Sequence, residues 1–216
     1  MGTIKKGILG GFSGKVGTVV GASWRGISYM RSLPQKVRNP RTAGQRSQRS
    51  KFTLALALLK PMTALLRIGW KLYAHRQSPF NAAMSYTLAN AITGTYPNYQ
   101  IDAGKVLISR GALTPAKVTA ERESGAANQS FITFKWADNS GTGSAKATDL
   151  ALITAIARGS SEMVITQIAQ TPRTIEECSI SIPEQWQGNE YDVYFGWVSE
   201  DGKEVSNSVY LGLITA

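Results

Sequence analysis

Residues 39–51 read NPRTAGQRSQRSK and mark the place where strand-like sequence gives way to helices. Thr42 and Gln45 stand at the two ends of a capping box, in which each side chain satisfies a backbone N–H at the start of a helix. Pro40 does not fit deep inside a helix, because it lacks an N–H and clashes with the preceding turn. We therefore predict a helix that starts at Ala43. Its apolar face recurs at helical spacing and consists of Phe52, Ala55, Leu56 and Leu59.

The same stretch belongs to a strongly asymmetric charge distribution. Residues 1–113 hold 17 Lys and Arg and a single acid, Asp102, whereas residues 114–216 hold 7 Lys and Arg and 13 acids. The two halves carry net charges of +16 and −6, within a chain of +10. Such asymmetry indicates that the first half meets something anionic: nucleic acid, an anionic membrane or an acidic protein surface, including another copy's second half. A merely solvated basic face is the alternative.

We name eight cationic residues as candidate contacts to nucleic acid, another anion or a neighbouring subunit. An arginine fork binds phosphate or carboxylate with two parallel hydrogen bonds, and a helix N-terminus adds partial positive charge. Binding of a nucleic-acid backbone would be independent of sequence and sensitive to salt. The candidates are Arg25, Arg31, Lys36, Arg38, Arg41, Arg46, Arg49 and Lys51.

Before this stretch, the glycine-rich residues 7–34 allow two interpretations. As strands, 16–24 and 27–33 form a hairpin around Arg25-Gly26, and glycines on one strand face indicate close approach by another backbone. As a helix, the glycines form one seam, like that of membrane helices. We favour the hairpin, because interior glycines weaken a helix in water by up to about 1 kcal/mol each. The expected close-packing interface consists of Gly14, Gly17 and Gly21.

After this stretch, the sequence predicts two further helices and a turn-rich bridge. Pro61 ends or kinks the first helix, and residues 62–76 form the second, with Trp70 turned away from its apolar side. The third helix has Ser78 as its cap, proline at its first position and Gly94 at its end. Residues 94–111 are expected to be turns with one short strand at 105–109.

The second half has a different texture. Seven strand-like runs of residues are separated by Gly, Asn, Ser and Pro, and this spacing is typical of a β-sandwich. Alternation is clearest in two runs, in which Ile132, Phe134 and Trp136 share one face and Tyr191, Val193, Phe195 and Trp197 share another. The predicted runs are 117–122, 131–136, 150–157, 163–169, 178–182, 191–198 and 205–214.

No catalytic or metal-binding pattern is complete. The segment "GGFSGKVG" fails as a phosphate-binding loop, because Leu9 and Val16 occupy the positions of the first glycine and the magnesium-binding hydroxyl. The lone Cys178 and the lone His75 are interpreted as structural. We therefore expect no enzyme, no cofactor, no metal and no small-molecule substrate. We recognise no secretory signal and no spanning segment of the roughly 20 apolar residues required.

Several segments resemble known families. "GILGGFSGKVGTVVGASWRGISYMRSLP", "NPRTAGQRSQRSKF", "FNAAMSYTLANAITGTYPNY" and "SEDGKEVSNSVY" look like an uncharacterised, domain-of-unknown-function family of gut Bacteroidota. The Asn-Pro-x-Thr-x-x-Gln run after a glycine-rich hairpin also resembles small proteins often encoded among phage genes, which implies a virion or prophage origin. Residues 114–216, with Trp136 closing the second strand and Tyr191 opening the sixth, resemble a fibronectin type III or immunoglobulin-like module.

These observations predict an α+β chain of two domains. Residues 1–113 form a basic hairpin-plus-helices domain, and residues 114–216 form an immunoglobulin-like β-sandwich. The expected function is that of a non-enzymatic structural protein in a phage-like capsid, neck or tail. Its partners would be its own copies, other virion proteins or nucleic acid, and its location the virion or the bacterial cytoplasm. A cellular nucleic-acid-binding protein and a membrane-active protein are the alternatives.

Overall fold

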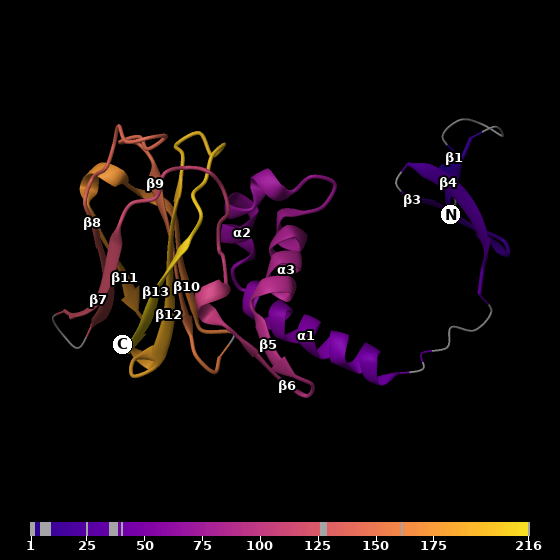
Figure 1. Cartoon of the computed structure of the whole chain (residues 1–216), viewed down its shortest axis with the longest axis horizontal. Coiled ribbons are helices and arrows are strands. Elements are labelled where there is room, and N and C mark those ends of the chain that lie inside the picture. The colour runs from indigo at the N-terminus through magenta and orange to yellow at the C-terminus, as the bar shows by residue number, and fades with distance from the viewer. Residues whose placement is uncertain are drawn as a thin grey trace. The chain divides into compact units, whose positions relative to one another are not determined.

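The computed structural model describes residues 3–4, 10–24, 26–34, 39, 41–125, 129–160 and 162–215. The chain forms two compact units, Met1–Thr42 and Ala43–Ala216. It is a mixed α+β protein whose C-terminal part is rich in strands (Figure 1). The sequence favoured a division after residue 113 instead, and the packing of the second unit explains the difference.

The N-terminal unit is a small antiparallel sheet in the order β1-β2-β3-β4. Its strands are β1 (Thr3–Ile4), β2 (Phe12–Val16), β3 (Val19–Trp24) and β4 (Ile27–Ser32). The predicted hairpin is confirmed by the β3–β4 pairing, in which Trp24 lies opposite Ile27. The expected strand 16–24 is wrong at its start: Val16 ends β2, and Gly17, with φ at 57°, turns the chain into β3.

Three helices follow: α1 (Ala43–Leu59), α2 (Thr63–Gly69) and α3 (Pro79–Asn90), with a short 3-10 turn η1 (Lys71–Tyr73) before α3. The predicted start at Ala43, the break near Pro61 and the Ser78 cap are confirmed, and Asn81 N–H donates to Ser78 Oγ at 3.1 Å. The second helix is shorter than predicted. Trp70 is buried in the core, and its Nε1–H donates to Leu107 O at 3.2 Å.

The turn-rich bridge holds a hairpin that the sequence analysis did not predict. Strand β5 (Ile92–Thr95) pairs with β6 (Asn98–Ile101), and the 3-10 turn η2 (Ala103–Lys105) follows. Gly94, with φ at 86°, lies in this hairpin and does not end α3. The predicted strand 105–109 is also wrong. This segment is held by Ser208, whose Oγ accepts from Ile108 N–H at 2.9 Å.

The C-terminal strands form two antiparallel sheets, ordered β11-β8-β7 and β10-β9-β12-β13. All seven predicted runs contain a strand, although the last strand starts four residues later than expected. Val205 instead forms an isolated bridge to Val198. The bounds are β7 (Val118–Ser124), β8 (Ser130–Trp136), β9 (Leu150–Ala157), β10 (Val164–Pro172), β11 (Glu177–Ile182), β12 (Glu190–Val198) and β13 (Val209–Thr215), with 3-10 turns η4 (Arg173–Ile175) and η5 (Glu184–Trp186).

The two sheets enclose one hydrophobic core. Both predicted apolar faces, one on β8 and one on β12, are buried in it. The rings of Phe134 and Phe195 lie 5.9 Å apart between centroids, and those of Trp136 and Trp197 lie 5.3 Å apart. The alternation in sequence therefore identified the inward faces correctly.

The outer face of the β10-β9-β12-β13 sheet is covered by the helices (Figure 1). Ile156 of β9 and Tyr194 of β12 join the same buried cluster as Leu59, Leu66 and Trp70. Strand β9 is accordingly buried along nearly its whole length, and its sequence LALITAIA is apolar except for Thr154. Because the helices share a core with this sheet, residues 43–113 do not pack as a domain apart from the strands.

Among the described helices, no single one is long and apolar enough to cross a membrane. Only α1 and α2 taken together reach that length and composition, and they are bent by 90° at the break between them.

Candidate functional site

The first candidate site is one face of the N-terminal sheet. Residues directly opposite in neighbouring strands share a face, so the Lys15–Val20–Arg31 row places two cations on one side of the sheet. Alternation along β3 and β4 puts Trp24 and Tyr29 on that same side. We call this surface, formed by Lys15, Val20, Ala22, Trp24, Ile27, Tyr29 and Arg31, the aromatic–cationic face.

One end of the aromatic–cationic face is hollowed. Trp24, Ile27 and Tyr29 line a shallow depression of about 420 Å³. Trp24 is 61% exposed and Tyr29 is 44% exposed, although large apolar side chains are normally buried. Lys15 and Arg31 at the other end are also exposed. The face thus offers stacking surface and positive charge side by side.

The three glycines expected at a close-packing interface have different surroundings. A side chain at Gly21 would collide with the carbonyl oxygen and ring of Phe12, so the close approach here is to β2 of the same chain. Gly14 and Gly17 adopt φ values of 110° and 57°, which favour glycine. Nothing lies within 4 Å of where a Gly17 side chain would begin, so its role is to form the turn.

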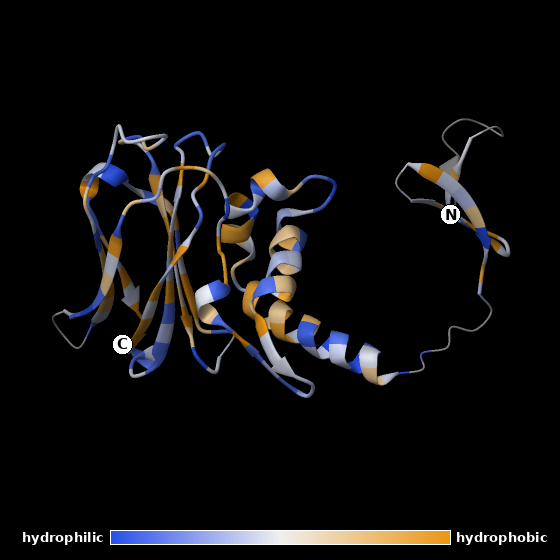
Figure 2. Ribbon diagram, viewed as in Figure 1, coloured by the Kyte–Doolittle hydropathy of each residue, from blue (hydrophilic) through white to orange (hydrophobic). Residues whose placement is uncertain are grey.

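The second candidate site is the first half of α1, whose ribbon carries several hydrophilic segments (Figure 2). Arg46 and Arg49 in this half are exposed. The structure separates the predicted cations onto different sides of the helix. Arg49 borders a hollow with Phe52 and Leu88, whereas Lys51 places its Nζ 4.9 Å from the ring centroid of Tyr99 on β6. Ser47 Oγ and Tyr99 OH share a hydrogen bond of 2.6 Å beside this contact.

The remaining predicted contact residues lie before the helix. Arg41 is exposed and adopts φ at 49°, an unusual value for a residue other than glycine. Arg25, Lys36 and Arg38 lie outside the described residues, as does Pro40. The one acid among the first 113 residues, Asp102, is engaged by Lys105, with 3.0 Å between its carboxylate and Nζ.

A third candidate is a cleft of about 1020 Å³ lined by α1, the end of β6, η2 and strands β9, β12 and β13. Its lining includes the apolar side chains of Leu54, Leu58 and Ile156 and an Arg158–Asp192 pair. Arg158 Nη2 and Nε donate to the two Asp192 oxygens at 3.0 and 3.1 Å. The Tyr210 hydroxyl also donates to Asp192, at 2.6 Å, so three hydrogen bonds from two side chains hold this carboxylate in place.

The tyrosines of this cleft are held protonated. Burial raises the pKa of Tyr194 well above its ordinary range, and the nearby Asp192 carboxylate acts in the same direction. Burial, together with the hydrogen bond to Asp192, likewise raises the pKa of Tyr210. The Tyr194 hydroxyl donates to Ala103 O at 3.0 Å. These phenols therefore act as hydrogen-bond donors that fix η2 and Asp192.

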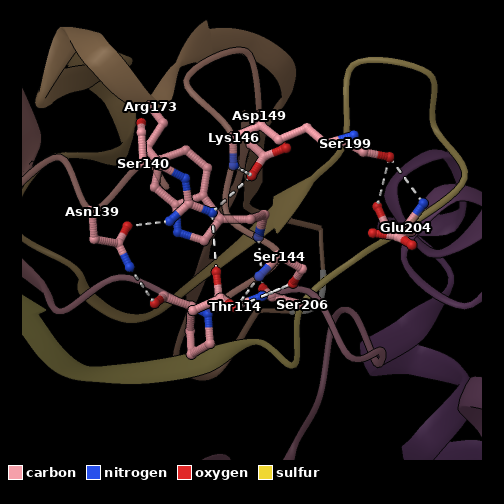
Figure 3. Close-up of polar contacts among 12 residues, drawn as sticks. Thr114, Asn139, Ser140, Ser144, Lys146, Asp149, Arg173, Ser199, Glu204 and Ser206 are labelled. Atoms are coloured by element: carbon pink, nitrogen blue, oxygen red, sulfur yellow. Dashed lines mark hydrogen bonds and ion pairs between the residues drawn. The ribbon is translucent and has the colours of Figure 1, made fainter. Parts of the chain in front are cut away.

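Arg173 and Asp149 form a buried ion pair whose hydrogen bonds connect parts of the protein fold (Figure 3). Both side chains are fully buried. Arg173 Nη2 donates to Asp149 Oδ2 at 3.1 Å and to Thr114 O at 3.0 Å, and Nη1 donates to Asn139 Oδ1. The guanidinium also lies 4.1 Å from the ring centroid of Trp197. The pair ties the loops around 114, 139 and 149 to the sheet core.

Sequence reasoning missed both the cleft and the buried pair. Asp192 lies on the face of β12 that points away from the sandwich core, where a polar residue is ordinary. Its place in the cleft is recognised only from residues of other elements that lie around it. The sequence does show an aromatic residue, Tyr194, at an outward position of β12, which signals that this second face of the strand is also covered. The lone Cys178 is buried, and burial raises the pKa of its thiol. Among the described residues, no group of three or more His, Cys, Asp or Glu could hold a metal ion.

Comparison with protein families gives a match to most of the chain. The model of a family described as a family of unknown function (DUF6266) matches residues 11–212. No curated protein matches the chain. The matched range takes in the aromatic–cationic face, the basic half of α1, the cleft and both sheets. The predicted resemblance to an uncharacterised family is confirmed.

Proposed function

We propose, from the premise that this chain belongs to the DUF6266 family, that it is a non-enzymatic structural protein of a multi-copy, phage-type assembly such as a capsid, neck or tail. The N-terminal unit attaches the protein to an anionic partner, which is nucleic acid or a neighbouring subunit. The helices and sheets of residues 43–216 form the body that this unit connects to the assembly.

The observation that carries this proposal is that the first unit combines a strong positive charge with very little burial of its described residues. Residues 1–42 contain eight Lys and Arg and no acid. They form their own compact unit, in which Gly21 is the one buried residue among those described. A small sheet without a core is marginally stable by itself. Contact with an anionic partner would supply both the missing burial and the missing counter-charge.

The larger unit suits a role as a spacer or platform. We propose that residues 114–216 form a fibronectin type III-like sandwich, and the strand order supports this. The first, second and fifth strands form one antiparallel sheet, and the third, fourth, sixth and seventh form the other. Modules of this kind occur with many functions, so this likeness supports an architectural role without assigning an activity.

The N-terminal motifs support an origin in phages or prophages of gut Bacteroidota. The glycine-rich hairpin followed by the Asn39–Gln45 run resembles segments of small proteins often encoded among phage genes. Both parts of this motif have structured counterparts here, as strands β2–β4 and the start of α1. Neighbouring portal, capsid or tail genes are the expected genomic context.

Sedimentation velocity of the purified full chain, with single-stranded DNA added back after nuclease treatment, tests this proposal. We expect multi-copy species at low salt that dissociate as salt rises, because surface charges are screened. The matched comparison is a variant with Lys15 and Arg31 changed to Glu against one with Lys60 and Lys71 changed to Glu. The first pair should abolish assembly and the second should not. A chain that remains monomeric at high concentration and low salt would contradict the proposal.

A cellular nucleic-acid-binding protein is the second candidate, favoured by the exposed Arg41, Arg46 and Arg49. It would bind duplex or single strands with an affinity that falls steeply with salt. Replacing these three arginines by Ala should then weaken binding. An unchanged affinity in that variant would remove this candidate.

A further inference from the structure

We infer that the aromatic–cationic face binds single-stranded nucleic acid, with bases stacked on Trp24 and Tyr29 and the backbone held by Lys15 and Arg31. This inference rests on the proposed function and specifies its anionic partner. Proteins that hold single strands combine exposed aromatic rings with a positively charged track for the phosphates. The N-terminal sheet presents these two elements on one side.

The register of the sheet places the two kinds of group at matching positions. Tyr29 and Arg31 are two residues apart on β4 and share a face, so their Cα atoms lie roughly 7 Å apart. Trp24 stands opposite Ile27, beside Tyr29, and these three residues line the hollow. A base entering this hollow would leave its phosphate near the Lys15–Arg31 row. Aromatic residues exposed on a sheet serve the same purpose in RNA-binding modules.

Charge favours nucleic acid over a second copy as the occupant. The acid-rich second half engages many of its own carboxylates with its own cations. Glu123 lies 2.8 Å from Lys135, and Asp201 lies 3.0 Å from Lys203. Asp149 and Asp192 are likewise held by Arg173 and Arg158. Residues 1–42 hold eight cations and no acid. A nucleic acid, with one negative charge on every nucleotide, is a better partner for them than the carboxylates of a second copy, many of which are already paired.

The test is the affinity of the full chain for a fluorescein-labelled oligo(dT) strand, measured by fluorescence anisotropy. Trp24→Ala and Tyr29→Ala should each weaken binding by about tenfold or more, because each stacked base contributes strongly to affinity. Trp24→Phe should retain most of the affinity, which separates stacking from a folding defect. Lys15→Gln and Arg31→Gln should each reduce the slope of log affinity against log salt by about 0.7.

The matched controls are Met30→Ala, on the opposite face of β4 and 70% exposed, and Tyr96→Ala, an exposed tyrosine of the larger unit. Both should bind as the unchanged protein does. Wild-type affinity in Trp24→Ala and Tyr29→Ala would overturn the inference. So would a result in which these variants lose self-association but keep their affinity for oligo(dT), because a second copy would then occupy the face. Oligonucleotide binding by a chain that never assembles would refute the proposed function and leave this inference standing.

Discussion

At the scale of single residues, Arg173 shows how an acid-rich half tolerates a buried cation. Its guanidinium is shared between a carboxylate, a carbonyl and an amide and lies over the Trp197 ring. Removal of one partner from such a pair leaves the other charge buried without compensation. The side chain therefore acts as a clamp on three loops, and its effect should appear in stability.

We predict that Arg173→Ala lowers the free energy of unfolding by about 3–5 kcal/mol, because Asp149 would remain buried and unpaired. Urea denaturation followed by tryptophan fluorescence measures this change. The control is Lys105→Ala, which removes an exposed ion pair with Asp102 and should cost less than about 1 kcal/mol. Equal losses in the two variants would show that Arg173 is not the clamp described.

Tyr194 gives a prediction about pH. Burial keeps its phenol protonated in the folded chain, because its pKa is raised, whereas the unfolded phenol ionises near pH 10. Its contribution to stability is therefore complete below about pH 10 and is lost progressively as the pH rises above that value. Urea midpoints measured from about pH 8 to 11 should fall at the alkaline end. Tyr194→Phe should flatten that fall, and an equally steep fall would contradict the assignment.

At the scale of elements, α3 depends on a capping interaction that was visible in the sequence. Ser78 accepts from Asn81 N–H, and Pro79 starts the helix. Ser78→Ala should lower stability by about 1 kcal/mol, because one N–H at the helix start loses its partner. Ser78→Asp restores an acceptor and should recover most of this loss in thermal or urea denaturation. If Asp destabilises the chain as much as Ala, the cap is not the cause.

Local patterns predicted most elements, and elements that depend on distant partners escaped prediction. The Ser78 cap, the break near Pro61 and the alternation in β8 and β12 depend on neighbours in sequence, so they could be read directly. Trp70 could not, because its burial depends on α3 and on Leu107. The hairpin of β5 and β6 was missed because Gly94 can end a helix or turn a hairpin, and only pairing decides between them.

The candidate sites were likewise predictable only where they depend on residues close together in the sequence. The sequence revealed which residues are cationic and that acids are absent from residues 1–42. The aromatic–cationic face needed the register of three strands, because alternation within one strand does not show which residues of its neighbours share a side. The cleft needed the helices and the sheet together, and no local pattern marks Arg158 and Asp192 as partners.

At the scale of the whole molecule, the division after Thr42 separates a unit in which Gly21 is the one buried residue among those described from a unit with large buried clusters. Strands β9 and β12 lie between two packed layers, so their amides should exchange slowly with solvent. Strands β2, β3 and β4 have no comparable cover from the described residues of their unit. In the free protein we expect their amides to exchange far faster than those of β9 and β12.

Hydrogen exchange read by mass spectrometry therefore tests the central claim, that the N-terminal unit is the docking element. The comparison is between the assembled full chain at low salt and the same chain dissociated at high salt. The account predicts that residues 12–32 gain strong protection on assembly, while β9 and β12 remain unchanged. Unchanged exchange in residues 12–32, with protection confined to the larger unit, would contradict it.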